Sequence, residues 1–239
     1  WNEAHPGMYY LVYDAKNNAY FNAPWFYGFG AWYVKEDGSV GLDTPEGLAA
    51  AEFFAELRKI MPKEMNYGIA QRLFDEGRAA IVMNGPWAIA EIEAVGINYG
   101  MTTLPIISAN GKPASPFIGV KILQLTPNAV DRGHAEVALD VMKYYTRASA
   151  QVYLAKTNQM IPTAKATVED PEVQALPSLA GFANQAALAS QPMPSTPFMS
   201  VLWNVVPPML DSIWTGGATP AEAVKTAQEE AESGIEEMK

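Results

Sequence analysis

The order of secondary structure is clearest in residues 74–87, which read Phe74-Asp75-Glu76-Gly77-Arg78-Ala79-Ala80-Ile81-Val82-Met83-Asn84-Gly85-Pro86-Trp87. A helix over residues 68–76 is predicted to end at Gly77, because glycine readily adopts the left-handed conformation that closes helices. Residues 79–83 form a short apolar run typical of a buried strand. The following turn leads into another helix that ends near Gly96. Trp87 stands in this strand-to-helix turn, at a position where open α/β sheets bind ligands.

Upstream of this stretch, the pattern predicts a strand over residues 8–13 and a helix over residues 20–30 that is entered through Pro24. Residues 32–40 predict a hairpin with Asp37-Gly38 as its turn. A longer helix is predicted to start at Thr44-Pro45 and to stop at Pro62, since a threonine cap followed by proline is a typical helix start.

Downstream, residues 99–105 and 117–125 predict strands, and residues 108–116 give the clearest linker signal in the chain. Residues 191–197 contain three prolines, which argues against regular structure there. Helices are expected over residues 132–155, 178–190 and 199–213, and a last helix opens with the capping box Thr219-Pro220-Ala221-Glu222. Helices alternating with strands indicate an α/β fold with helices packed on a sheet.

Composition excludes several classes of protein. The 239 residues are 49% hydrophobic and carry a formal net charge of −10, so nucleic acid is not expected as a partner. No apolar run is long enough to span a membrane. The chain has no cysteine, which rules out disulfides and thiolate metal sites.

Catalytic and metal-binding patterns are not found in the sequence. His5 and His134 lie in no recognisable nucleophile setting, and no metal-ligand spacing or phosphate-binding loop appears. No catalytic residue, metal or cofactor is therefore predicted. A glycoside hydrolase stays open as an alternative, because its two carboxylates need no fixed spacing in sequence.

Aromatic residues make up 11% of the chain and gather in segments rich in turn residues. An aromatic face covers the apolar side of a sugar ring, while amides and hydroxyls bond its hydroxyl fringe. Tyr20, Phe21, Trp87 and Trp203 are the candidates for this role. For Trp203, flanked by apolar residues, a place in the core is an equally good interpretation.

These residues resemble the maltose/maltodextrin-binding proteins of bacterial ABC importers. The resemblance runs over essentially the whole chain and is most specific in residues 74–87. Residues 98–100, 104–105 and 116–120 follow at the family's spacing, and Met193-Pro194 with residues 199–203 resembles its late binding segment.

The resemblance implies a non-catalytic sugar receptor. Tyr20, Trp87 and Trp203 match aromatic residues that stack on successive glucose units, and Phe21, Tyr67 and Met193 match residues lining the same groove. The implied partners are maltose or maltodextrin and the membrane permease of an ABC importer, and the implied location is periplasmic or extracellular, with tethering to the cell surface included.

Three departures leave the choice of sugar open. Asn18 stands where an acidic sugar-binding residue is expected, Asn204 replaces an aromatic residue, and Pro207 replaces a basic one. A receptor for another disaccharide such as trehalose, and a purely structural use of the lobe, therefore remain alternatives.

The implied fold is a lobe of the periplasmic-binding-protein type II, a mixed sheet flanked by helices. Residues 1–117 and 172–239 are expected to form the C-terminal lobe, and residues 118–171 the segment returning to the N-terminal lobe. The rest of that N-terminal lobe is expected to lie outside these 239 residues, as a separate fragment or a removed part.

Overall fold

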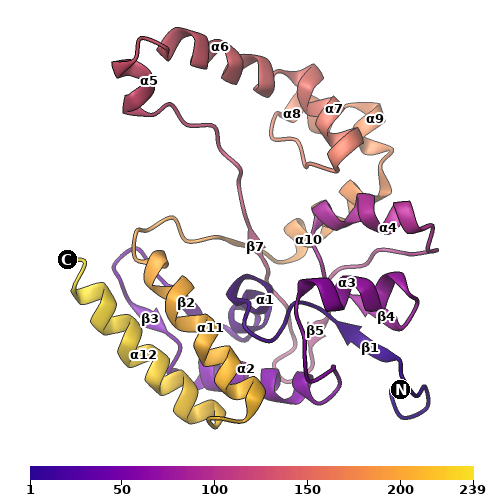
Figure 1. Cartoon of the computed structure of the whole chain (residues 1–239), viewed down its shortest axis with the longest axis vertical. Helices are drawn as coiled ribbons and strands as arrows, with labels where there is room; N and C mark the ends of the chain where they lie inside the picture. Colours follow the sequence, from indigo (N-terminus) through magenta and orange to yellow (C-terminus); the bar gives the residue numbers. More distant parts are fainter. The chain divides into compact units, whose positions relative to one another are not determined.

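The computed structural model describes residues 1–176 and 178–239 and divides the chain into two compact units (Figure 1). The first unit contains Trp1–Asn84, Leu104–Ile118 and Ala186–Lys239, and the second contains Gly85–Thr103 and Gly119–Gln185. The assignment of residues 118–171 to another lobe concerns the whole receptor and stays a prediction.

The strands of the first unit are short and pair in twos. Within the described residues they form four two-stranded sheets, two parallel and two antiparallel. The pairs are β1 (Tyr9–Val12) with β4 (Ala79–Val82), β2 (Trp32–Val34) with β3 (Val40–Gly41), β5 (Ile106–Ile107) with β6 (Lys112–Pro113), and β7 (Phe117–Ile118) with β8 (Gln191–Pro192).

Five helices pack around these strands: α1 (Ala19–Phe29), α2 (Pro45–Arg58), α3 (Tyr67–Asp75), α11 (Met199–Thr215) and α12 (Pro220–Glu236). Their ends follow from local chemistry. The Thr44 hydroxyl accepts a hydrogen bond from the backbone of Gly47 at 3.1 Å, which caps α2. Thr219 and Glu222 form the predicted capping box of α12.

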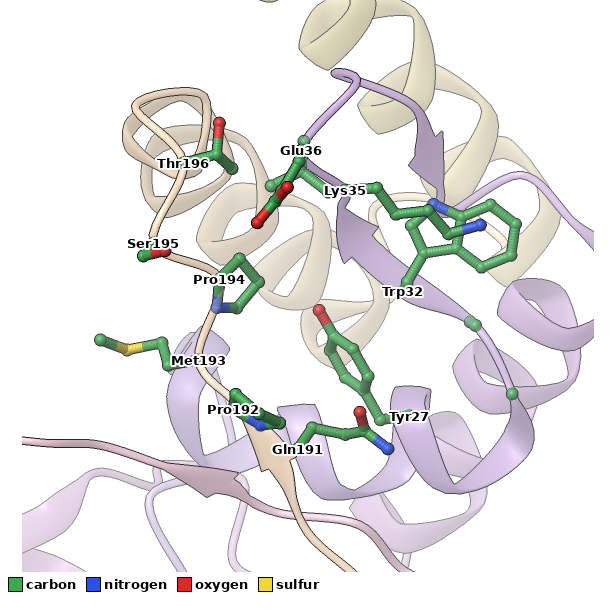
Figure 2. A pocket seen from close by; sticks show the side chains of 13 residues that line it. Tyr27, Trp32, Lys35, Glu36, Gln191, Pro192, Met193, Pro194, Ser195 and Thr196 are labelled. Atoms are coloured by element: carbon green, nitrogen blue, oxygen red, sulfur yellow. The ribbon is translucent and has the colours of Figure 1, made fainter.

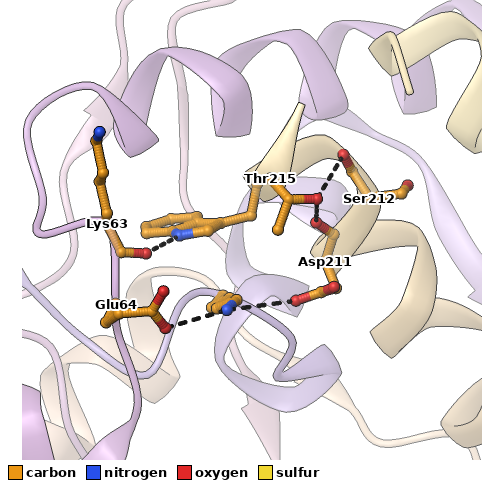
Figure 3. A network of polar contacts seen from close by, with 7 residues as sticks. Lys63, Glu64, Asp211, Ser212 and Thr215 are labelled. Atoms are coloured by element: carbon orange, nitrogen blue, oxygen red, sulfur yellow. Dashed lines mark hydrogen bonds and ion pairs between the residues drawn. The ribbon is translucent and has the colours of Figure 1, made fainter. Parts of the chain in front are cut away.

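The core of the first unit is rich in aromatic side chains. Its largest fully buried residues include Trp25, Trp214, Tyr13, Tyr33, Phe26 and Phe54. Trp214 of α11 packs its ring 5.6 Å from that of Phe54 on α2, and its indole nitrogen donates to the Lys63 carbonyl at 2.6 Å. This contact attaches α11 to the loop between α2 and α3 (Figure 3).

A half-buried lysine adds charge pairing beside this contact. Lys16 Nζ lies 3.2 Å from a carboxylate oxygen of Glu64 and 3.8 Å from one of Asp211 (Figure 3). Lys16 thus joins the loop before α1 to the α2–α3 loop and to α11.

The last helix is tied to the small hairpin by one side chain. The Gln228 amide oxygen of α12 accepts from the backbone of Leu42 at 3.0 Å and of Asp43 at 3.2 Å. Its nitrogen donates to the Val40 carbonyl at 3.1 Å. Gln228 therefore satisfies backbone groups around β3 that have no partner strand on that side.

The second unit is helical and has a small core. Its elements are η1 (Pro86–Ala88), α4 (Ile89–Val95), α5 (Pro127–Asp131), α6 (Ala135–Thr146), α7 (Ala148–Asn158), α8 (Lys165–Val168), α9 (Pro171–Gln174) and most of α10 (Pro177–Leu188). Its buried cluster consists of Ala155, Val173 and Leu179. Large apolar side chains remain exposed, among them Ile122 at 72% and Val137 at 67%.

Several predictions about local structure were wrong. Residues 99–105 form no strand, and residues 108–116 are not a linker but most of the hairpin β5–β6 and a buried continuation. The hairpin is held by long-range contacts, because Asn110 donates to the Gly28 carbonyl at 3.0 Å and the Ser115 backbone to the Pro24 carbonyl at 2.9 Å. Such contacts leave no local sequence signal.

Proline placement accounts for the other corrections. Pro24 lies inside α1 rather than at its entrance, because Asn18 caps the helix six residues earlier. The helix α2 ends at Arg58, before Pro62, and the Pro-rich residues 191–197 contribute the short strand β8. No helix that the structure describes has the length and apolar character needed to cross a bilayer.

Candidate functional site

The first turn of α1 carries two of the predicted sugar-binding residues. The Asn18 side chain accepts from the Phe21 backbone at 3.2 Å, which fixes the start of the helix. Tyr20 and Phe21 are half-buried, with ring centroids 6.0 Å apart and an angle of 76° between the rings. Burial raises the pKa of Tyr20, so its hydroxyl stays protonated and able to donate.

A buried hydrogen-bond network holds the loop that leads into this turn. Trp25 donates to the Tyr13 hydroxyl at 3.0 Å, and that hydroxyl donates to Asn22 Oδ1 at 2.9 Å. The Asn22 amide then donates to the carbonyls of Ala15 at 2.7 Å and Asn18 at 2.9 Å. The position of Tyr20 and Phe21 therefore depends on groups in the core.

Phe117 joins the predicted aromatic residues of the first unit. Its ring lies 6.0 Å from Tyr20 and 6.4 Å from Trp203, the latter nearly perpendicular at 80°. The Tyr20 hydroxyl also donates to the Phe117 carbonyl at 3.4 Å. At the other end, the Phe21 ring lies 6.4 Å from Tyr67.

These contacts place five rings in succession, which we call the aromatic row: Tyr67, Phe21, Tyr20, Phe117 and Trp203. Four of them were predicted as sugar-binding residues. Phe117 was not, although Pro116 before it and Gly119 after it set an aromatic residue in a turn-rich segment. Phe117 is only 5% exposed, so its part in the row is to pack against the neighbouring rings.

Met193 is brought close to the aromatic row by strand pairing. Its backbone donates to the Ile118 carbonyl at 3.3 Å, one residue after Phe117, and its side chain is 38% exposed. Trp87, the sixth predicted residue, lies in the second unit, where it is 45% exposed in η1.

A groove of about 690 Å³ runs beside β8 in the first unit (Figure 2). Tyr27, Trp32, Lys35 and Glu36 line one wall, and residues 191–196 line the other. Lys35 Nζ lies 3.7 Å from the centre of the Trp32 ring, in a cation–π contact. The Met193 side chain points away from Tyr27 in this view, toward the opposite side of the loop.

The three departures from the maltodextrin pattern have visible structural roles. Asn18 caps α1, and the exposed Asn204 donates to the Ser200 carbonyl at 3.0 Å within its own helix. Pro207 lies inside α11 next to Pro208. None of the three presents a charge to a ligand.

The described residues contain no group of three or more His, Cys, Asp or Glu side chains that could hold a metal ion. His5 stacks on Trp1 with ring centroids 4.1 Å apart, and His134 is an exposed residue at the start of α6. The first unit thus offers aromatic surface and hydrogen-bonding groups, as a binding site for a neutral polar ligand requires.

The family model described as bacterial extracellular solute-binding protein matches residues 1–181. The chain belongs to the bacterial extracellular solute-binding proteins. A maltotriose-binding protein of Pyrococcus abyssi is 32% identical over 201 residues, which are 82% of this chain and 44% of that protein. A galactooligosaccharide-binding protein of Bacillus subtilis is 29% identical over 87% of this chain and 51% of its own length.

This solute-binding protein has the same fold as two solved structures of maltose/maltodextrin-binding proteins. The maltose/maltodextrin-binding domain MalE of Bdellovibrio bacteriovorus, bound to maltotriose, covers 96% of the chain with a TM-score of 0.88 and 30% identity. The maltose-maltodextrin binding protein of Alicyclobacillus acidocaldarius covers 93% with a TM-score of 0.84 and 26% identity. The chain covers 61% and 62% of these two structures and about half the length of the curated relatives.

These findings confirm the predicted α/β fold class and the resemblance to the maltose/maltodextrin-binding proteins. The family is extracellular and consists of binding proteins rather than enzymes. The roles of the six predicted sugar-binding residues stay predictions.

Proposed function

We propose that this chain binds linear glucose oligosaccharides of the maltose/maltodextrin type for delivery to the permease of an ABC importer. The aromatic row is the observation that supports the proposal. Its four predicted members come from three helices, α1, α3 and α11, yet lie in one succession of neighbouring rings with Phe117. Successive rings suit successive sugar units, because each aromatic face covers the apolar side of one ring.

Within this proposal, Tyr20, Trp87 and Trp203 stack on the sugar, and Phe21, Tyr67 and Met193 line the sugar-binding site beside them. Bound sugar would then favour the form in which the hinge between the lobes is closed, since a ligand shifts the equilibrium toward the state it binds more tightly. This chain covers about half the length of its relatives. We therefore expect it alone to bind maltotriose more weakly than about 1 μM.

The test is a tryptophan-fluorescence titration with maltotriose. Replacing Trp203 with alanine is expected to weaken binding roughly 3- to 10-fold, because one stacking contact is lost. Trp1→Ala is the matched control, since Trp1 is 46% exposed near the N-terminus and belongs to no predicted site. Equal affinity in the wild type and in Trp203→Ala would contradict a platform role for Trp203.

A galactose-based oligosaccharide is the second candidate ligand. The galactooligosaccharide-binding relative from Bacillus subtilis matches more of this chain than the maltotriose-binding one, at slightly lower identity. Parallel titrations with maltotriose, a β-linked galactotriose and trehalose decide between them. Tighter binding of the galactotriose would replace glucose by galactose in the proposal and leave the aromatic row as the site.

We also propose that residues 118–171 belong to the other lobe of the whole receptor. Many large apolar side chains in this segment are exposed, such as Val120 at 66% and Ile122 at 72%, and an accumulation of exposed apolar surface indicates a face that another part covers. The relatives are about twice as long as this chain. In the proposed whole receptor, the further residues cover these side chains.

Hydrogen exchange of the 239-residue chain tests this assignment. Backbone amides of α6 and α7 are expected to exchange at least about 100-fold faster than those of α11, because α6 has no buried residue, α7 packs on a small cluster and α11 packs on the main core. Protection of α6 equal to that of α11 would show that the segment is already a finished part of this chain.

A further inference from the structure

Asp14 lies where the two helices that carry most of the aromatic row begin. Its carboxylate accepts from the Asn18 side chain at 2.6 Å, and Asn18 caps α1, which carries Tyr20 and Phe21. The backbone of Tyr67, the first residue of α3, is near enough to this carboxylate to lower its pKa. Asp14 is therefore bonded to the start of α1 and lies near the start of α3, the two helices whose rings, Phe21 and Tyr67, lie 6.4 Å apart.

The neighbouring Asn18 amide is neutral and is already engaged through both its oxygen and its nitrogen. Asn18 Oδ1 already accepts from the Phe21 backbone, and its nitrogen is committed to Asp14. Asp14 is thus the carboxylate bonded directly to this end of the row. Lys16, two residues later, instead pairs with Glu64 and Asp211.

The Asp14 carboxylate retains capacity for a ligand. An ionised carboxylate has about four acceptor positions, and the Asn18 amide occupies one of them. Burial raises the pKa of this group even though its contacts with Asn18 and Tyr67 act to lower it. The ionised form is therefore incompletely solvated, and another donor would stabilise it. The side chain is half-buried, so one side of it stays open to solvent.

We propose that the Asp14 carboxylate accepts a hydrogen bond from a hydroxyl group of the sugar unit that packs against Phe21 and Tyr67. This inference rests on the proposed sugar-binding function and adds to it the residue that recognises one hydroxyl group of the sugar. A ring stacked on aromatic faces is held mainly by its apolar side, whereas a fixed carboxylate distinguishes a sugar with the hydroxyl from one without it.

The first experiment compares the wild type with Asp14→Asn. The amide keeps the shape and one oxygen for Asn18, but presents a donor where the second carboxylate oxygen was. Maltotriose binding is expected to weaken about tenfold or more, as for loss of a hydrogen bond to a charged group. Glu52→Gln, on the exposed face of α2, is the control for the same change in net charge and is expected to bind within twofold of the wild type.

The second experiment separates recognition from a structural role. Monodeoxy analogues of maltotriose are titrated against both the wild type and Asp14→Asn. One analogue is expected to lose about tenfold in the wild type and less than about threefold in the variant, because the lost hydroxyl and the lost carboxylate are partners. A merely structural Asp14 would change all affinities by a common factor.

The inference is overturned if Asp14→Asn binds maltotriose within twofold of the wild type, or if every analogue loses the same factor in both proteins. If the wild type binds only the galactotriose, the same cycle is run with its deoxy analogues. If the folded wild type binds none of the sugars, the proposed function itself fails and the role of Asp14 fails with it.

Discussion

Replacing Trp214 with alanine is expected to lower the free energy of unfolding of the first unit by about 3–5 kcal/mol. Trp214 is 2% exposed, its ring packs against Phe54 of α2, and its indole nitrogen bonds the Lys63 carbonyl. The substitution leaves a cavity between α2 and α11 and removes the donor from a buried carbonyl. Both effects act in the same direction.

The measurement is urea unfolding followed by far-ultraviolet circular dichroism. Trp87→Ala is the matched control, since this tryptophan is 45% exposed and its loss is expected to change the unfolding free energy by less than about 1 kcal/mol. A loss below about 1 kcal/mol for Trp214→Ala would show that α11 does not pack on α2 as described.

Replacing Phe117 with alanine is expected to lower the free energy of unfolding by about 3–5 kcal/mol and also to weaken sugar binding. Phe117 is 5% exposed and contacts the rings of Tyr20 and Trp203. Each of these aromatic contacts contributes about 0.5–1.5 kcal/mol beyond area burial, so the two neighbours lose a defined orientation. Maltotriose affinity is expected to fall roughly fivefold or more in the folded variant.

A second phenylalanine distinguishes the effect on binding from the effect on stability. Phe53 of α2 packs against Trp25 at 5.3 Å and Phe29 at 5.6 Å, and belongs to no predicted site. Phe53→Ala is expected to lose stability while keeping maltotriose affinity within twofold, measured at a temperature where both variants are folded. If Phe117→Ala also keeps its affinity, the aromatic row does not bind the sugar.

Local signals in the sequence predicted the helix and strand boundaries that depend on local chemistry. Thr44, Gly77 and Thr219 each mark a helix end through a cap or a left-handed residue, and the structure confirms all three. The hairpin over residues 32–40 follows from Asp37-Gly38 in the same way, and Gly38 has a φ of 84°. Such features are fixed by contacts between neighbours in the chain.

The hairpin β5–β6 could not be predicted because it is fixed by distant residues. Residues 108–116 have the composition of a linker, yet Ala114 and Ser115 are buried against α1. A side chain at Gly28 would collide with Ile107, its Cβ lying only 2.7 Å from Cδ1. The close approach depends on a glycine some 80 residues away.

The candidate site, like the fold, could be predicted only in part. The resemblance singled out Tyr20, Phe21, Tyr67 and Trp203, and the structure brings these four rings into one row. Phe117 was missed because its burial and its ring contacts arise only when β7 pairs with β8, 74 residues later in the chain. Pattern alone does not reveal which aromatic residue lies beneath the others.

The bonds of Gln228 have a consequence for the order in which the molecule is made. This side chain supplies partners for the backbone of Val40, Leu42 and Asp43, at separations of 185 to 188 residues. When the hairpin β2–β3 has emerged from the ribosome, most of the chain must still be synthesised before those partners exist. The first unit can therefore complete its fold only after translation reaches α12, and until then the hairpin edge remains open to other contacts, including those made with chaperones.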